Sequence, residues 1–294
     1  MSHALKYGEL VLLMETQKKR RTYTVALKEN SQLHTHQGSL NHDDLVGLSE
    51  GSRVSTNTGT VFLVFRPRVA DRMMKVRRKT QIIYPKDAGW LLMALDLFPG
   101  AHVIEMGIGS GAFTILLAQT VGEKGKIYSF DRREEFIENA LFNLSRSGYA
   151  ERVTTGVLEA GESFPVENAD GVFLDLPNPW VAIPPAYQAL APGRPLSLLV
   201  PNAEQLKTAV DSLHQNCFGS IEALELMERR MLVRQKEGVR PQERMIGFTG
   251  YLVSARKLEN NRQKTAEEGS ENSYSAGAPE ITSEGVKPPW TETS

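Results

Sequence analysis

The sequence predicts an α/β protein in which a doubly wound, Rossmann-like sheet follows a small N-terminal β-module. Three observations support this fold class. In residues 67–258, stretches with helical spacing alternate with short apolar stretches, which is typical of a doubly wound sheet. One of those apolar stretches runs into a turn with glycines at alternate positions. Residues 1–66 instead carry short strand-like runs separated by turn residues.

Within the N-terminal module, we expect strands over Leu10–Met14, Tyr23–Leu27 and Val61–Phe65. The turn-rich pieces between them leave no room for helices and favour a small β-barrel or β-sandwich. A basic connector, Arg66–Lys79, leads into the larger domain.

In the larger domain, Asp87 is expected to cap a helix, and Asn202 is expected to cap another. The other predicted elements are a helix over Phe136–Leu144, strands over Gly171–Leu174 and Leu196–Val200, and a closing strand pair over Ile221–Leu232 and Met245–Ala255. From residue 259 onward, apolar residues almost vanish. Because such a segment cannot bury enough surface to offset its ordering entropy, we predict a disordered tail over 259–294.

Composition narrows the functional classes. The net charge is −1, so a nucleic-acid partner would have to meet a local basic patch rather than a polycation. Cys217 is the only cysteine, which excludes an intrachain disulfide and favours a reducing compartment. Neither a signal-peptide pattern nor an apolar run of about 20 residues is present, so we expect a cytoplasmic protein without a membrane partner.

The glycine-rich turn is suited to a nucleotide-like cofactor, because glycine lets the backbone approach a ligand closely. Two cofactors compete for it. The dinucleotide fingerprint G-x-G-x-x-G/A fits Gly107, Gly109 and Ala112, with Asp131 about 20 residues further on as the ribose-binding acid.

The alternative depends on Glu105 and on a third glycine, Gly111, which give the pattern E-x-G-x-G-x-G. This pattern resembles motif I of the S-adenosylmethionine (SAM) methyltransferases. A carboxylate facing the ligand suits the ammonium group of SAM and repels the pyrophosphate of a dinucleotide. We therefore favour SAM, with Asp131 binding its ribose.

The chain as a whole resembles the tRNA (adenine-58-N1)-methyltransferases of the bacterial and archaeal type, from the N-terminal module to about residue 257. Four stretches carry the resemblance: Arg77–Asp87, Glu105–Phe113, Asp175–Trp180 and Val239–Tyr251. The first, with T-Q-I-I-Y-P-K-D at its end, is the most distinctive. The last departs from the family pattern, because Phe248 stands where histidine is usual.

This resemblance implies a doubly wound SAM-methyltransferase sheet and a set of site residues. Asp175, at the end of a predicted central strand, and Tyr84 are the expected catalytic residues, with Asp175 meeting the target base. Asp175 could instead cap the next turn. The implied SAM-binding residues are Gln81, Glu105, Gly107, Gly109, Ser110, Gly111, Ala112, Phe113, Asp131, Phe136, Glu159 and Asp175. Surface solvation of Gln81 and ordinary packing of Phe136 are the alternatives.

For tRNA, the resemblance and the basic runs point to Arg77, Arg78, Lys79, Trp180 and Arg240. Trp180 could equally be a packing residue. A further basic run, 18–21, is as compatible with a solvated face as with RNA. Position 58 lies inside the T-loop, so the base must leave its stack to react.

Members of this family are typically homotetramers, and we expect the same assembly here. No metal is expected, because His34, His36 and His42 lack the spacing of known ligand sets. Three rival functions remain: methylation of a small molecule or protein carboxylate, tRNA binding by a catalytically silent subunit, and nicotinamide-dependent oxidoreduction.

Overall fold

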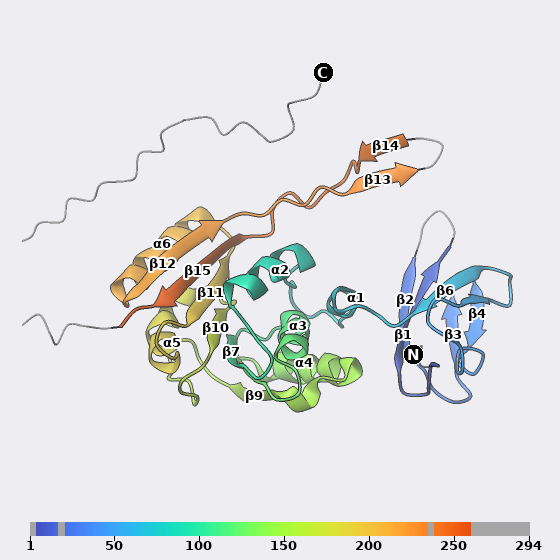
Figure 1. The fold of residues 1–294 in the computed structure, drawn as a ribbon, viewed down its shortest axis with the longest axis horizontal. Helices are drawn as coiled ribbons and strands as arrows, with labels where there is room; N and C mark the ends of the chain where they lie inside the picture. Colours follow the sequence, from blue (N-terminus) through green and yellow to red (C-terminus); the bar gives the residue numbers. More distant parts are fainter. Residues whose placement is uncertain (1–3, 17–20, 235–237, 260–294) are drawn as a thin grey trace, which may run out of the picture. The chain divides into compact units, whose positions relative to one another are not determined.

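The computed structural model describes residues 4–16, 21–234 and 238–259 (Figure 1). Residues 260–294 of the predicted tail and residues 18–20 of the first basic run lie outside this part. In the described part, no helix is long and apolar enough to cross a membrane.

The N-terminal module contains a four-stranded antiparallel sheet of order β2-β1-β6-β5 and a separate hairpin, β3–β4. The strands are β1 Leu10–Glu15, β2 Thr22–Ala26, β3 Gln32–Thr35, β4 Gly38–Asn41, β5 Arg53–Ser55 and β6 Val61–Phe65. The three predicted strands are confirmed as β1, β2 and β6. The other three lie in the turn-rich pieces, where runs of three or four residues are too short to show an alternating pattern. The domain boundary at residue 66 stays a prediction.

The basic connector contains an element that the sequence analysis did not predict. It contains a six-residue helix, α1 Val69–Met74. The Asp71 carboxylate accepts a hydrogen bond from the backbone N–H of Arg68 at 3.0 Å. Met73 is buried in the core of the larger domain. Six residues are less than two turns, so helical periodicity could not reveal this element.

The larger domain has a seven-stranded sheet of order β12-β15-β11-β10-β7-β8-β9. Its strands are β7 His102–Met106, β8 Lys126–Asp131, β9 Val153–Val157, β10 Gly171–Leu174, β11 Pro195–Val200, β12 Phe218–Leu224 and β15 Tyr251–Lys257. The five strands from β11 to β9 pair in parallel, and β15 runs antiparallel to both of its neighbours. This arrangement confirms the predicted fold class.

Helices cover both faces of this sheet. They are α2 Pro85–Ala94, α3 Ala112–Val121, α4 Glu134–Ser147, α5 Ile183–Ala189 and α6 Ala203–Gln215, with short 3₁₀ turns η1 Ala150–Arg152 and η2 Pro179–Val181. Val103 packs with α2, α3 and α4 in one core cluster, whereas its neighbour Ile104 packs with α5 and α6 in another. Side chains alternate along a strand, so adjacent residues of β7 reach opposite layers.

One predicted helix cap is confirmed and one is wrong. Asn202 caps α6, because its side-chain oxygen accepts a hydrogen bond from the N–H of Gln205 at 2.9 Å. Asp87 does not cap α2. That helix begins at Pro85, with Tyr84 at the cap position, and Asp87 lies buried in its first turn. Proline is well suited to the first helical position, because it lacks an N–H and has a fixed φ.

The predicted closing strand pair is confirmed in part, as β12 and β15. Between them, β13 Met231–Arg234 and β14 Gly238–Pro241 form a separate hairpin, and the segment before β15 is not a strand. The sequence suggested a longer first strand because apolar and acidic residues continue to intermix past the end of β12, over 225–228. In the structure, Val233 and Val239 of this hairpin are 75% and 64% exposed.

Candidate active site

The glycine turn connects β7 to α3 at the carboxyl edge of the sheet. Gly107 has a φ of +98°, and a Cβ atom there would overlap the backbone carbonyl of Asp175 at the end of β10. Its N–H donates to the Phe130 carbonyl of β8 at 2.8 Å. Only glycine fits such a close approach between three neighbouring strands.

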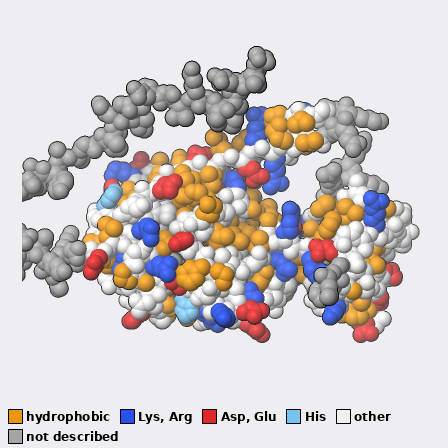
Figure 2. All heavy atoms as spheres, viewed as in Figure 1, with side chains coloured by type: hydrophobic (Ala, Val, Ile, Leu, Met, Phe, Trp, Pro, Cys, Tyr) orange, Lys and Arg blue, Asp and Glu red, His pale blue; other side chains and the backbone are white. Residues whose placement is uncertain are grey.

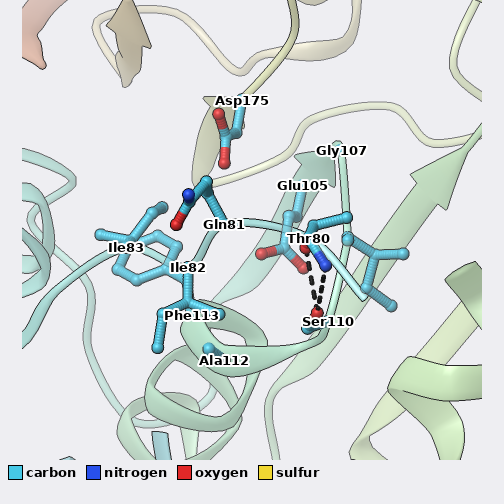
Figure 3. Close-up of a pocket in the computed structure, with 12 residues that line it drawn as sticks. Thr80, Gln81, Ile82, Ile83, Glu105, Gly107, Ser110, Ala112, Phe113 and Asp175 are labelled. Carbon is cyan, nitrogen blue, oxygen red and sulfur yellow. Dashed lines mark hydrogen bonds between the residues drawn. The ribbon is translucent and has the colours of Figure 1, made fainter. Parts of the chain in front are cut away.

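A cavity of about 200 Å³ lies against this turn (Figure 3). Its walls are formed by Thr80, Gln81, Ile82, Ile83, Glu105, Gly107, Ile108, Gly109, Ser110, Ala112, Phe113 and Asp175. The Ser110 hydroxyl joins the two walls: it accepts hydrogen bonds from the N–H groups of Lys79 and Thr80 at 3.0 and 3.2 Å. The segment before α2 is thereby held over the glycine turn.

Glu105 is the most deeply buried charged group of this cavity, with 1% of the residue exposed. Its Oε2 atom accepts hydrogen bonds from the Thr114 hydroxyl at 2.7 Å and the Ser129 hydroxyl at 2.5 Å. Burial raises the pKa of Glu105 to about 7. The nearby charges of Asp175 and Asp131 also raise it, whereas the two hydroxyl donors lower it.

Two further carboxylates stand at the ends of the strands beside β7. Burial, together with the charge of Asp131, raises the pKa of Asp175 to about 6. Asp131, at the end of β8, accepts hydrogen bonds from the N–H groups of Gly109 at 3.3 Å and Arg133 at 3.1 Å. Figure 3 shows the Asp175 carboxylate pointing toward Gln81, with Glu105 on the neighbouring strand. Carboxylates crowded in this way create a strongly negative site.

The residues present fit SAM. A negative site with perturbed carboxylates favours a ligand that carries positive charge, as the ammonium and sulfonium groups of SAM do. It disfavours the pyrophosphate of a nicotinamide cofactor. The fold and this turn therefore define a SAM-dependent methyltransferase.

A second cavity, of about 290 Å³, adjoins the first. It is lined by Gln81, Ile82, Ile83, Tyr84, Asp87, Asp175, Leu199, Ile246, Phe248 and Thr249. Gln81, Ile82, Ile83 and Asp175 line both cavities. The Phe248 ring contacts Tyr251 edge to face, with the ring centroids 5.1 Å apart. Asp175 thus stands between a cofactor-sized space and a second space with aromatic walls.

The structure does not bring every predicted SAM-binding residue to the first cavity. Gly111 does not line it either: it stands at the N-cap position of α3, and a Cβ atom there would meet Ala140 of α4. Asp131, Phe136 and Glu159 lie beyond the cavity, at or after the ends of β8 and β9. The Phe136 ring is covered by the Arg133 guanidinium at 3.5 Å, and Glu159 is exposed. Asp131, Phe136 and Glu159 lie along the same edge of the sheet as the glycine turn. They would therefore contact a ligand that extends from β7 toward β9.

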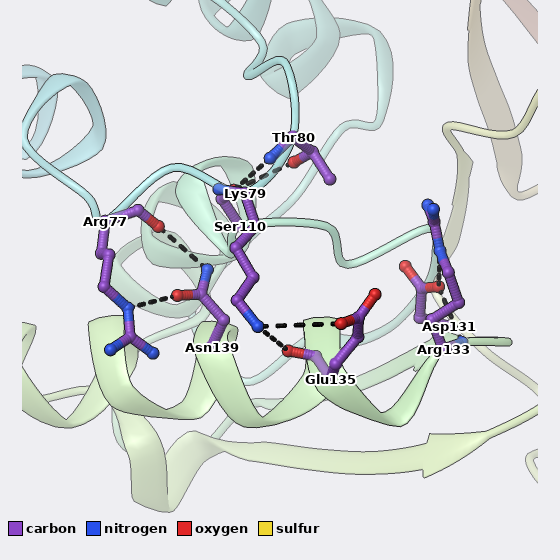
Figure 4. Close-up of polar contacts among 8 residues, drawn as sticks. All are labelled: Arg77, Lys79, Thr80, Ser110, Asp131, Arg133, Glu135 and Asn139. Carbon is purple, nitrogen blue, oxygen red and sulfur yellow. Dashed lines mark hydrogen bonds and ion pairs between the residues drawn. The ribbon is translucent and has the colours of Figure 1, made fainter.

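The predicted tRNA-binding cations are exposed, but each also has an intramolecular partner. Figure 4 shows the partners of Arg77 and Lys79. Arg77 donates from Nε to the Asn139 side-chain oxygen at 2.6 Å and lies over the Phe142 ring. Lys79 lies 3.9 Å from a Glu135 carboxylate oxygen.

Arg78 donates to the Met74 carbonyl at 3.3 Å, and Arg240, on β14, pairs with Glu243 at 2.7 Å. Trp180, in η2, is half-buried and packs on the core cluster that contains α5 and α6. In the described residues, no group of three or more His, Cys, Asp or Glu side chains is arranged to hold a metal.

Sequence reasoning missed several residues of the site. Ser129 has a recognisable pattern, because it is a polar residue within an apolar strand and pairs in register with Glu105. Asp87 was interpreted as a helix cap and as the last residue of the first family stretch, but not as a site residue. Ile246 and Thr249 lie in the fourth stretch of the family resemblance, and Leu199 lies in a predicted strand, but none of them was predicted to be a site residue. They reach the second cavity only through the pairing of β11 with β15 and the segment before β15.

Comparison with known proteins identifies the family. Residues 64–292 match the family model described as "tRNA methyltransferase complex GCD14 subunit", and residues 4–54 match the "TrmI-like N-terminal" model. The chain belongs to this tRNA methyltransferase family.

Individual relatives agree with that assignment. The chain is 35% identical to tRNA (adenine(58)-N(1))-methyltransferase TrmI of Thermus thermophilus over 83% of this chain and 96% of the relative. It is similar to the crystal structure of tRNA (m1A58) methyltransferase TrmI from Aquifex aeolicus, with a TM-score of 0.74, 30% identity and coverage of 88% and 100%. A SAM-dependent O-methyltransferase from Thermotoga maritima gives a TM-score of 0.81, 33% identity and coverage of 88% and 96%.

Proposed function

We propose that this protein transfers the methyl group of SAM to N1 of adenine 58 in the T-loop of tRNA. The observation that carries the proposal is the pair of adjoining cavities with Asp175 on their shared wall. One cavity adjoins the glycine turn typical of SAM sites, and the other is lined by aromatic side chains and carboxylates. Family membership supports tRNA as the substrate.

SAM, when bound, supplies a methyl group on a positively charged sulfur. Glu105 is placed to bind the cofactor's ammonium group, since its carboxylate lies beneath the glycine turn. Gly107, Gly109 and Gly111 let the backbone approach the same end of the ligand. The remaining proposed contacts are those of Gln81, Ser110, Ala112 and Phe113 along the cavity, and of Asp131, Phe136 and Glu159 further along the sheet edge.

The target base is proposed to occupy the second cavity, after leaving its stack in the T-loop. Tyr84 and Phe248 offer ring faces or edges for the base. Methylation at N1 moves positive charge onto adenine, and the Asp175 carboxylate is placed to stabilise that charge. It can also accept a hydrogen bond from the 6-amino group of adenine.

An oxygen acceptor is the second candidate, because the similar Thermotoga maritima structure is described as an O-methyltransferase. The charge of the second cavity argues against a carboxylate substrate, since both Asp87 and Asp175 line it and would repel one. Loss of catalytic function is disfavoured as well, because the glycine turn, Glu105 and Asp175 are all in place.

For tRNA, the proposed phosphate contacts are Arg77, Arg78 and Lys79, which directly precede the segment shared by both cavities. Phosphate contacts at this position would orient the RNA over the site without reading its sequence. Trp180 and Arg240 are proposed as more distant contacts.

We also propose a cytoplasmic homotetramer. Met231, Val233 and Val239 on the β13–β14 hairpin are more than half exposed. Figure 2 shows hydrophobic side chains gathered on this hairpin. Exposed apolar side chains gathered on one element favour a protein interface. A second copy of the chain is the proposed occupant, and assembly would also combine the basic residues of several copies into a larger surface for RNA.

The proposal is tested with radiolabelled SAM and an unmodified tRNA transcript, compared with a transcript in which adenine 58 is changed to guanine. We expect label in the first transcript and almost none in the second. Equal incorporation into both would exclude position 58 as the target. Incorporation into neither, with label found in a protein or a small hydroxyl compound, would support the second candidate.

A further inference from the structure

Asp87 is an ionisable residue of the second cavity that the mechanism above does not use. Its side chain is 1% exposed, and it lies in the first turn of α2. Its Oδ1 atom accepts a hydrogen bond from the Lys86 ammonium at 2.6 Å. Its Oδ2 atom is buried and has no hydrogen-bond partner among the residues that the structure describes.

Lys86 cannot serve that second oxygen. Its ammonium group also donates to the Thr249 hydroxyl at 2.6 Å and to the Leu226 carbonyl at 2.8 Å. These two contacts and the one to Asp87 use all three N–H bonds of a lysine. The orientation of the Asp87 carboxylate is thereby held, with Oδ1 toward Lys86. A buried carboxylate oxygen without a donor is costly. Because Asp87 lines the second cavity, a ligand that occupies this cavity can supply the missing donor.

The chemistry of the expected substrate identifies that donor. The adenine ring carries acceptors at its ring nitrogens, and its exocyclic 6-amino group is its only N–H donor. We propose that Asp87 Oδ2 accepts a hydrogen bond from the 6-amino group of the target adenine and so selects adenine over bases that carry an oxygen there. This inference rests on the proposed function. The amino group has two N–H bonds, so Asp175 can accept the other.

The fixed orientation of Asp87 makes Asp87→Asn an informative variant. Lys86 needs an oxygen opposite it, so the new amide would keep its oxygen toward Lys86 and place its NH₂ group where Oδ2 stands in the wild type. An acceptor would become a donor with little change of shape. The variant should therefore lose recognition of the amino group, whereas a merely structural role would slow all substrates alike.

The experiment measures kcat/KM for two tRNA substrates that carry adenosine or purine riboside, which lacks the amino group, at position 58. Wild-type protein should prefer adenosine. Asp87→Asn should reduce that preference by about 10- to 100-fold, the worth of a hydrogen bond to a charged group. The intrinsic difference in reactivity between the two bases is common to both proteins and cancels in the ratio.

Asp170→Asn is the matched control, because Asp170 pairs with Arg194 at 2.9 Å at the opposite end of β10. It should keep the wild-type preference. SAM binding by calorimetry reports whether Asp87→Asn is folded; if it is not, Asp87→Glu replaces it. That variant keeps the charge but moves the free oxygen, and it should also lower the preference.

The outcomes separate the two proposals. An active wild-type enzyme whose preference survives substitution of Asp87 overturns this inference alone. A wild-type protein that leaves the adenosine transcript unmethylated overturns the proposed function, and the inference falls with it.

Discussion

Replacing Glu105 with glutamine tests the electrostatics of the cofactor site. The substitution keeps the shape of the side chain and an oxygen for the Thr114 and Ser129 hydroxyls, but it removes the buried charge. We expect the protein without SAM to become more stable and its affinity for SAM to fall. Functional sites often lose stability to a charge that the ligand later neutralises.

The size of the expected stability change follows from the pKa of Glu105, which is raised from 4.5 to about 7. Below pH 4.5, the group is protonated in both the folded and unfolded states. As the pH rises toward 7, only the unfolded state releases the proton, so the free energy of unfolding decreases. At pH 8 the full pKa shift lowers the free energy of unfolding by about 3 kcal/mol, whereas at pH 5.5 it lowers it by about 1 kcal/mol. The stabilisation by Glu105→Gln should therefore be about 2 kcal/mol larger at pH 8 than at pH 5.5.

Urea denaturation at both pH values, followed by circular dichroism, measures the stability, and calorimetry measures SAM binding. We expect SAM affinity to fall about 10- to 100-fold, as for loss of a charge-assisted hydrogen bond. Glu15→Gln, which changes a buried glutamate of β1, should leave SAM affinity unchanged. Equal effects of Glu105→Gln at the two pH values, or undiminished SAM binding, would refute the reasoning.

Three further predictions concern turnover, the glycine turn and assembly. Asp175→Ala should bind SAM within about threefold of wild type but lose at least about 100-fold in kcat; an undiminished kcat would remove this carboxylate from the mechanism. Gly107→Ala should abolish SAM binding because the new methyl group meets the Asp175 backbone, whereas Gly59→Ala, at a similar φ of +84° but in open space, should retain it. Equal SAM binding by the two variants would show that the clash is relieved. Val233→Asp should convert a tetramer into smaller species in light-scattering chromatography, and a wild-type protein that elutes as a monomer would refute the proposed assembly.

Much of the fold could be predicted because its indications are local. The strand before Asp175 and the Asn202 cap each depend on a few consecutive residues, and the structure confirms both. Elements whose limits depend on distant partners were less predictable. The closing strands were placed too broadly, because the apolar residues that follow β12 and precede β15 do not show where the pairing between these two strands begins and ends.

The candidate site also combines features that local sequence patterns indicate with contacts that depend on distant residues. The glycine turn and the strand-end carboxylates could be recognised from sequence, because this fold places functional groups at the carboxyl ends of its strands. The internal partners of the Arg77 side chain could not be recognised from sequence, since Asn139 and Phe142 lie more than 60 positions further along the chain. Exposure of a basic run is visible in a sequence, but its contacts are not.

By itself, the sequence determined the class of cofactor, because Glu105 and the three glycines occupy alternate positions within one stretch of seven residues. Only the tertiary structure decided what surrounds that turn. It placed the second cavity beside the first, raised the pKa of Glu105 through burial, and left one oxygen of Asp87 without a partner. Burial, desolvation and unpaired polar atoms are properties of three-dimensional packing, so they depend on residues that are distant in sequence.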